Sequence, residues 1–115
     1  MKALGPYSFS TKAGKLVFLS GQLGLDKEGN LVEGGVAKET KQAMKNAKKI
    51  LKSQGLGFGD VVKATIFLTN MDDFAAVNEV YASYLKEPYP ARSCVGVSSI
   101  AKGAAVEIEF IAVAK

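Results

Sequence analysis

The 115-residue chain contains no histidine, no tryptophan and a single cysteine. One cysteine cannot form an internal disulfide, and one cysteine without histidine cannot supply the ligands of an ordinary zinc site, so we expect no metal. The lack of histidine also excludes the commonest general base, the Ser-His-Asp triad and the Cys-His pair. Any chemistry must therefore depend on Arg, Lys, Tyr, Glu, Asp, Cys, backbone groups and water.

Long hydrophobic runs are also missing, although 48% of the residues are hydrophobic. No run approaches the roughly 20 apolar residues that a membrane-spanning helix needs. The first residues, MKALGPYS, show neither a long apolar region nor the small-residue cleavage pattern of a secretory signal. We therefore expect a soluble, cytoplasmic protein without a membrane partner, folded as one domain over residues 1–115.

The net charge of +4 is concentrated in residues 35–55, GVAKETKQAMKNAKKILKSQG. Apolar or small residues recur there in steps of three and four, which predicts a helix that ends at Gly55. The opposite face carries a lysine stripe formed by Lys38, Lys41, Lys45, Lys48 and Lys52. Such a stripe is most often a solvated outer face. The alternative is a phosphate-binding surface for RNA, but no aromatic residue or arginine accompanies the lysines to stack on bases.

A second helix is predicted over residues 72–85, DDFAAVNEVYASYL, with Asn70 or Asp72 as its N-cap. Asn78 points the same way as the apolar stripe of this helix, and a buried asparagine needs hydrogen-bond partners. Such a residue more often forms hydrogen bonds that hold a neighbouring loop in place, and contact with a ligand is the alternative. The core face is expected to comprise Phe74, Val77, Tyr81, Tyr84 and Leu85.

Four other segments are rich in β-branched and aromatic residues and are predicted to be strands. They begin at Lys15 (KLVFLSGQL), Val61 (VVKATIFL), Arg92 (RSCVGV) and Val106 (VEIEFIAV). A short leading strand, YSFST, pairs with the first of them through a turn at residues 12–14. The order β, β, α, β, α, β, β predicts an α+β fold, with one mixed sheet and both helices on the same face.

Two helices on one face leave the other face of the sheet uncovered, although several strands carry apolar residues on both sides. Alternation in VVKATIFL places Val62, Ala64, Ile66 and Leu68 on one side of the sheet, and Val61, Thr65 and Phe67 on the other. An uncovered apolar face of this size predicts an interface. Self-association into a closed ring or dimer is the simplest way to bury it.

Residues suited to chemistry gather in the last two strands. Alternation puts Glu107 and Glu109 on one face of the last strand. They either face solvent or pair with a lysine, or one of them points into a cleft where burial keeps it ready to accept a proton. Arg92 would supply the positive pole of that cleft, because its planar fork suits a carboxylate. Cys94 lies on the same side as Arg92 and is more often a buried hydrophobe than a nucleophile, since no histidine can activate it.

Weaker signals lie near the start of the chain. Tyr7 follows a proline in LGPYS, and Ser20 and Gly21 stand at a strand end in LSGQL, where a glycine lets a ligand approach the backbone. Six segments, in order along nearly the whole chain, resemble the RidA (YjgF) family of reactive intermediate deaminases. They are GPYS, SGQL, VVKATIFL, MDDFAAVNEVYASYL, PARSCVGV and AAVEIEFIAVAK. PARS and VEIE in that spacing, combined with DF..VNEVY, are hard to obtain by chance.

The resemblance implies a chorismate-mutase-like α+β fold assembled as a homotrimer, with three clefts between subunits. It also implies cofactor-free hydrolysis of 2-imino acids, the products of pyridoxal-phosphate enzymes such as threonine or serine dehydratase. By motif match, Arg92 would clamp the substrate carboxylate and Glu107 would orient the attacking water. The cleft-lining positions would be Tyr7, Ser20, Gly21, Asn78 and the backbone at Cys94.

Three departures from the family pattern stand near the implied cleft. Phe9 replaces a common glutamine after GPYS, Ala101 replaces a frequent proline before KGA, and the approach YLKEPYPARS is a few residues shorter than usual. A shorter loop at the cleft rim would alter substrate size or access. Arg92 is present, and relatives without that arginine are the ones expected to lack deaminase activity.

The leading hypothesis is therefore a deaminase that converts 2-iminobutanoate or 2-iminopropanoate to a 2-oxo acid and ammonia. One alternative is an RNA-binding or RNA-cleaving translation inhibitor, which only the lysine stripe supports. Another is a non-catalytic sensor or holdase that binds 2-oxo acids through Arg92 without turnover.

Overall fold

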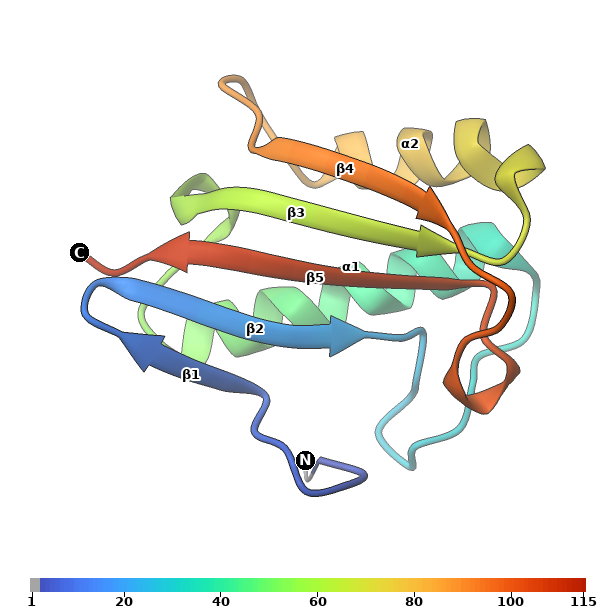
Figure 1. The fold of residues 1–115 in the computed structure, drawn as a ribbon, viewed down its shortest axis with the longest axis horizontal. Coiled ribbons are helices and arrows are strands. Elements are labelled where there is room, and N and C mark those ends of the chain that lie inside the picture. Colours follow the sequence, from blue (N-terminus) through green and yellow to red (C-terminus); the bar gives the residue numbers. More distant parts are fainter. Residues whose placement is uncertain (1–2) are drawn as a thin grey trace.

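The computed structural model describes residues 3–115, which follow the predicted order of strands and helices (Figure 1). The elements are β1 (Ser10–Ala13), β2 (Leu16–Gln22), α1 (Val36–Ser53), β3 (Val61–Leu68), α2 (Phe74–Ser83), β4 (Ala91–Gly96) and β5 (Val106–Val113). The second helix is shorter than residues 72–85, because a 3-10 turn at Met71–Asp73 precedes it. Asn70 caps that turn by accepting a hydrogen bond from the Asp72 backbone N–H at 2.9 Å.

The strands form one mixed sheet in the order β1-β2-β5-β3-β4. The β3–β4 pair is parallel, and the other pairs are antiparallel. Because parallel strands need a crossover connection, α2 joins β3 to β4 across one face of the sheet. The predicted α+β architecture is therefore confirmed, and β5 lies between the hairpin and the parallel pair.

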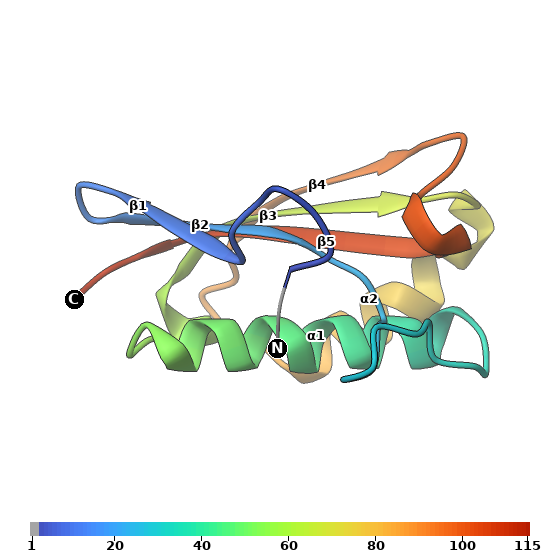
Figure 2. The same cartoon turned by 90° about the horizontal axis from the view of Figure 1, so that it is seen from below.

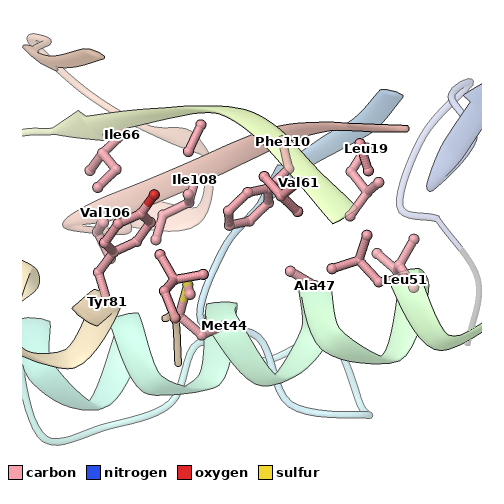
Figure 3. Packing of buried hydrophobic residues seen from close by; sticks show 14 of the residues in the cluster. Leu19, Met44, Ala47, Leu51, Val61, Ile66, Tyr81, Val106, Ile108 and Phe110 are labelled. Atoms are coloured by element: carbon pink, nitrogen blue, oxygen red, sulfur yellow. The ribbon is translucent and has the colours of Figure 1, made fainter. Parts of the chain in front are cut away.

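Both helices lie against the same face of the sheet (Figure 2). Their apolar residues pack onto the strands, with Met44 and Leu51 of α1 and Tyr81 of α2 beneath Ile108 and Phe110 of β5 (Figure 3). This layer forms the hydrophobic core, as the period of the helical patterns predicts. Within residues 3–115, neither helix combines the length and the apolar character that crossing a bilayer requires.

In the part of the chain that the structure describes, no layer of helices covers the opposite face of the sheet (Figure 2). Apolar side chains are nevertheless present on it, and Leu16, Phe18 and Val95 are 41%, 38% and 41% exposed. Water contact with side chains of this size is unfavourable by roughly 25 cal/mol per Å². We call this surface the open face.

Two predicted orientations are wrong. Val61 is buried and Val62 is 47% exposed, which reverses their expected sides. The cause is an irregularity in the β3–β5 pairing between Val61 and Lys63, where a bulge interrupts the alternation. Phe74 is 38% exposed rather than part of the core, because it stands at the first residue of α2, beside Arg92.

Candidate functional site

A β-bulge in β2 shapes one part of the candidate site. Leu19 pairs with Phe110 and Gln22 pairs with Ile108, so Ser20 and Gly21 together stand opposite the single residue Glu109. Bulges of this kind are common beside active sites, where they redirect side chains. The two residues that the sequence placed at a strand end therefore belong to an irregular point inside the sheet.

The missing side chain of Gly21 makes room for Glu107. A Cβ atom at position 21 would lie 2.7 Å from the carboxyl carbon of Glu107 and 2.9 Å from its Cγ. Real side chains do not approach so closely, so only glycine allows the carboxylate to rest against the bulge. Gly21 thus positions Glu107, which goes beyond its predicted contact with a ligand.

A cavity of about 740 Å³, the Glu107 pocket, opens beside this carboxylate. Tyr7, Ser20 and Gly21 line it together with Glu107. Burial raises the pKa of the Glu107 carboxyl above its ordinary 4.5, and the neighbouring charge of Glu109 raises it further. A carboxyl group whose pKa is moved towards neutrality is suited to exchanging protons with a substrate or with water.

The segment before β1 is fixed to the bulge by Ser20. The Ser20 backbone N–H donates to the carbonyl of Phe9 at 2.9 Å, and its hydroxyl donates to the carbonyl of Ser8 at 2.6 Å. These bonds bring Tyr7 and Phe9 to the wall of the Glu107 pocket. The hydroxyl of Ser20 therefore has a structural partner within the chain.

The far wall of the pocket is held to α1 by Asn46. Its side-chain amide donates to the carbonyls of Leu23 at 3.2 Å and Leu25 at 2.9 Å. Gly24 lies between them, and a Cβ there would be 2.6 Å from the Cα of Glu39, so the loop can approach the helix this closely only with glycine. Asn46 was missed in the sequence, although a polar residue within the apolar stripe of a helix is a usable signal.

Arg92 occupies a separate place, which we call the Arg92 cradle, with Phe74, Asn78 and Tyr81 of α2. Its Nη1 donates to Asn78 Oδ1 at 2.6 Å. The guanidinium carbon lies 5.6 Å from the ring centre of Phe74 and 5.1 Å from that of Tyr81, both within cation–π range. No carboxylate of residues 3–115 forms an ion pair with it. The contribution of the two rings was not foreseen from the sequence.

Two groups with shifted pKa values are Tyr81, which is part of the cradle, and Cys94, which lies beside it. Burial raises the pKa of the Tyr81 phenol and of the Cys94 thiol, and the positive charge of Arg92 partly opposes both shifts. The Cys94 thiol is therefore protonated at neutral pH, which suits packing rather than nucleophilic attack. Cys94 contacts the edge of the core, as the sequence favours.

Arg92 and Glu107 lie on opposite sides of the sheet. Arg92 pairs with Ala64, which is fully buried under the helices. Glu107 pairs with Phe67 and is flanked along β5 by the buried Val106 and Ile108, so it points to the open face. One chain thus brings Tyr7, Ser20, Gly21 and Glu107 together, and separately brings Arg92, Asn78 and Cys94 together.

Comparison with known proteins agrees with these motifs. A family model described as Endoribonuclease L-PSP matches residues 1–114. The chain is 46% identical over 112 residues to a human protein named 2-iminobutanoate/2-iminopropanoate deaminase, covering 96% of this chain and 82% of that protein. The crystal structure of RidA from Psychrobacter sp. has a TM-score of 0.93 at 43% identity, covering 97% of this chain and 91% of the other.

A structure of E. coli TdcF with bound serine has a TM-score of 0.91 at 38% identity, covering 98% of this chain and 91% of that one. The similarity therefore extends over nearly the full length of the chain and over the whole sheet and helix layer. The chain belongs to the RidA (YjgF) family, whose model carries the name Endoribonuclease L-PSP.

Proposed function

We propose that the protein is a hydrolytic deaminase of 2-imino acids, with 2-iminobutanoate and 2-iminopropanoate as substrates. In the reaction, water and the imine give a 2-oxo acid and ammonia. Relatives that are 46–48% identical are named for this activity. The imine carbon is already electrophilic, so the site needs to hold the substrate, place a water and move protons.

The observation that carries the proposal is the Arg92 guanidinium, which is half-buried and has no carboxylate partner among residues 3–115. A buried cation is costly unless an anion meets it. Arg92 uses one N–H on Asn78, which leaves further donors of its planar fork for an anion. A substrate carboxylate fits that fork in bidentate geometry, while the rings of Phe74 and Tyr81 restrict its movement.

Glu107 manages the protons in this mechanism. Its carboxylate takes a proton from water as the oxygen bonds to the imine carbon and the C=N electron pair moves to nitrogen. Glu107 returns that proton to nitrogen, which gives the neutral carbinolamine. It then takes the hydroxyl proton and passes it to the same nitrogen, so that the C–N bond breaks, ammonia leaves with the electron pair of that bond and the carbonyl forms. Burial and the charge of Glu109 raise the pKa of Glu107, which makes its carboxylate a stronger proton acceptor than an exposed one.

Because Arg92 and Glu107 lie on opposite sides of one sheet, a second copy of the chain supplies the missing partner. We infer a homotrimer in which the Arg92 cradle of one subunit meets the Glu107 pocket of the next. A closed ring of this kind uses two different surfaces of each subunit. It also buries the apolar side chains of the open face, including Phe18 and Val95.

The activity is tested by generating 2-iminobutanoate in place with threonine dehydratase and trapping the remaining imine with semicarbazide. The protein should accelerate loss of the imine, and Arg92→Ala should lower kcat/KM by about 30- to 1,000-fold, since a buried charge-assisted contact contributes about 2 to 4 kcal/mol. Equal imine loss with and without the protein would exclude the deaminase. Tight binding of 2-oxobutanoate without turnover would favour the sensor.

Mixing two inactive variants tests the shared site. Equal amounts of Arg92→Ala and Glu107→Gln subunits are unfolded together and refolded. The mixture should have about a quarter of the wild-type activity, because about a quarter of the randomly formed subunit contacts combine an intact Arg92 with an intact Glu107. Each variant refolded separately is the control. A mixture no more active than the controls would place both residues of each site in one subunit.

A second candidate, RNA binding, is favoured by the charge of α1. This helix carries six of the 15 basic residues and only one of the 11 acidic residues. The charges of the other nine basic and ten acidic residues nearly cancel, so the positive net charge is that of α1. The stripe residues Lys41, Lys45, Lys48 and Lys52 are exposed. Binding through them should weaken steeply as salt rises, and Lys41→Glu with Lys45→Glu should abolish it. Salt-independent binding would reject this function.

A further inference from the structure

We propose that Glu39, in the first turn of α1, is a positioning residue for the deaminase reaction: it holds the start of β5 and thereby fixes the place of Glu107. This inference rests on the proposed deaminase function. It is carried by the burial of Glu39, by the backbone group that its carboxylate binds, and by the position of that group two residues before Glu107.

Glu39 is buried in a helix whose other charged residues face solvent. It is 7% exposed, whereas the six lysines of α1 are all exposed. Burying a carboxylate is costly unless hydrogen bonds or opposite charges compensate for its lost hydration. Within residues 3–115 Glu39 forms no ion pair, so a hydrogen bond and the positive end of the α1 dipole stabilise it. A carboxylate buried at this cost points to a specific contact.

The partner of Glu39 is the residue that leads into β5. Glu39 Oε1 accepts a hydrogen bond from the Ala105 backbone N–H at 2.8 Å. The Ala105 carbonyl accepts from the backbone N–H of Thr69, which follows β3, at 3.2 Å. The start of α1 and the start of β5 lie at the same end of the molecule (Figure 1 and Figure 2). Ala105 is therefore held by α1 and by the end of β3 together.

Glu107 lies near the end of the sheet that these two bonds secure. The last pair of the β3–β5 ladder is Leu68 with Val106, and Glu107 pairs with Phe67, one residue further in. The ends of strands open at low cost in free energy unless further contacts hold them. The carboxylate of Glu107 rests against the bulge at Gly21, so fraying of β5 would move it out of place. The bond from α1 opposes that fraying.

The loop before β5 depends on the same bond. Ile100 and Ala101 lie beside Glu107 and line a small hollow with it. Lys102 has a φ of 64°, in the left-handed region that residues with a Cβ rarely adopt. Such a conformation persists only where the surrounding structure holds it, and Ala105 anchors the loop three residues later. Releasing Ala105 would disturb the backbone on one side of the proton acceptor.

Glu39 acts on Glu107 through the backbone of β5. It belongs to the helix layer, whereas Glu107 points to the open face on the other side of the sheet (Figure 2). Arg92, which is proposed to bind the substrate carboxylate, lies on β4 and pairs with β3. Loss of the Glu39 bond should therefore reduce proton transfer and leave binding of the substrate carboxylate unchanged. A general loss of stability would not separate these two effects.

Three substitutions test the bond. Glu39→Met keeps the length of the side chain but removes the acceptor, so kcat/KM in the imine-trapping assay should fall by about 100-fold, the cost of misplacing a reacting group by about 1 Å. Glu39→Gln keeps an acceptor oxygen and should stay within about threefold of the wild type. Thr40→Val is the matched control: it removes the hydrogen bond from the adjacent, buried Thr40 hydroxyl to the Val36 carbonyl and should leave kcat/KM unchanged.

Two further measurements test whether Glu39 acts through Glu107. The dissociation constant of 2-oxobutanoate, measured by calorimetry, should change by less than about twofold in Glu39→Met, because Arg92 binds the carboxylate. In a protein that also carries Glu107→Gln, Glu39→Met should lower kcat/KM no further, because the group that Glu39 positions has already lost its function. If Glu39→Met fails to fold, Glu39→Asp replaces it, since its carboxylate is one methylene too short to reach Ala105.

Several results would contradict the positioning role. Wild-type kcat/KM in Glu39→Met, a loss in Glu39→Gln as large as in Glu39→Met, or a loss that persists without the Glu107 carboxylate would overturn the proposal and leave the deaminase function intact. A parallel weakening of 2-oxobutanoate binding would also overturn it, by assigning Glu39 to general stability. Imine loss at the same rate with and without the wild-type protein would overturn both.

Discussion

Replacing Gly21 with alanine should separate the position of Glu107 from its chemistry. The added methyl group would lie 2.7 Å from the carboxyl carbon of Glu107, which cannot stay where it is. The φ angle of Gly21 is not in the left-handed region, so alanine strains the site through this contact and not through its backbone. The substitution therefore displaces the proposed proton acceptor without removing it.

The expected loss of activity is large compared with the loss of stability. A misplacement of about 1 Å in a reacting group can cost about 100-fold in rate, so we expect kcat/KM to fall by about that factor. Overpacking a core costs about 1–3 kcal/mol, but Glu107 is only partly buried and can turn into its pocket. We therefore expect the free energy of unfolding to change by about 1 kcal/mol or less.

Imine trapping and urea unfolding measure the two quantities. Gly59→Ala is the matched control, because a Cβ at Gly59 meets no atom within 4 Å. In a protein that also carries Glu107→Ala, Gly21→Ala should no longer destabilise the fold, because the carboxyl group that the new methyl group would meet has been removed. Wild-type activity in Gly21→Ala, or an unfolding cost that persists without the Glu107 side chain, would refute the assigned role.

The remaining predictions concern charge and assembly. Arg92→Lys should retain less than a tenth of kcat/KM, because an ammonium lacks the fork that binds Asn78 and a carboxylate together; near-wild-type kinetics would contradict the clamp. Burial and the charge of Glu109 raise the folded pKa of Glu107 above 4.5, so the unfolded state loses this proton first and the stability of the wild type falls as the pH rises above 4.5. Glu107→Gln has no such group, so it should gain unfolding free energy relative to wild type as the pH rises above 4.5. A pH-independent difference in urea unfolding would argue against this burial. Phe18→Lys should give a folded monomer by light scattering and circular dichroism, without deaminase activity; an unchanged mass would exclude the open face as the interface.

Periodicity predicted most of the fold. The bounds of β3 and β5 agree with the segments VVKATIFL and VEIEFIAV, because strands buried on one face show strict alternation. The errors at Val61 and Val62 arise at a bulge, where one extra residue shifts the alternation. Nothing in the side chains of that segment marks the extra residue, since valine suits either side of a strand.

The site was less predictable than the fold. Sequence patterns placed Arg92 and Glu107 on strands, but the sides to which they point depend on which strands are neighbours. The order β5-β3-β4 and the pairing of Arg92 with Ala64 are long-range facts that no local pattern contains. The same holds for the fit of Glu107 against Gly21, which requires the β2 bulge to face β5.

The separation of Arg92 from Glu107 has a chemical advantage in a protein without histidine. A guanidinium beside Glu107 in the same chain would form an ion pair and lower the pKa of the carboxyl, which would remove its capacity to exchange protons near neutrality. Here burial and Glu109 raise that pKa, while Arg92 is held elsewhere by Asn78 and aromatic rings. In the proposed assembly the two meet with a substrate carboxylate on Arg92. The substrate carboxylate thus neutralises the charge of Arg92, which would otherwise lower the pKa of Glu107. The Glu107 carboxyl can then act as the general base in a protein that has no histidine.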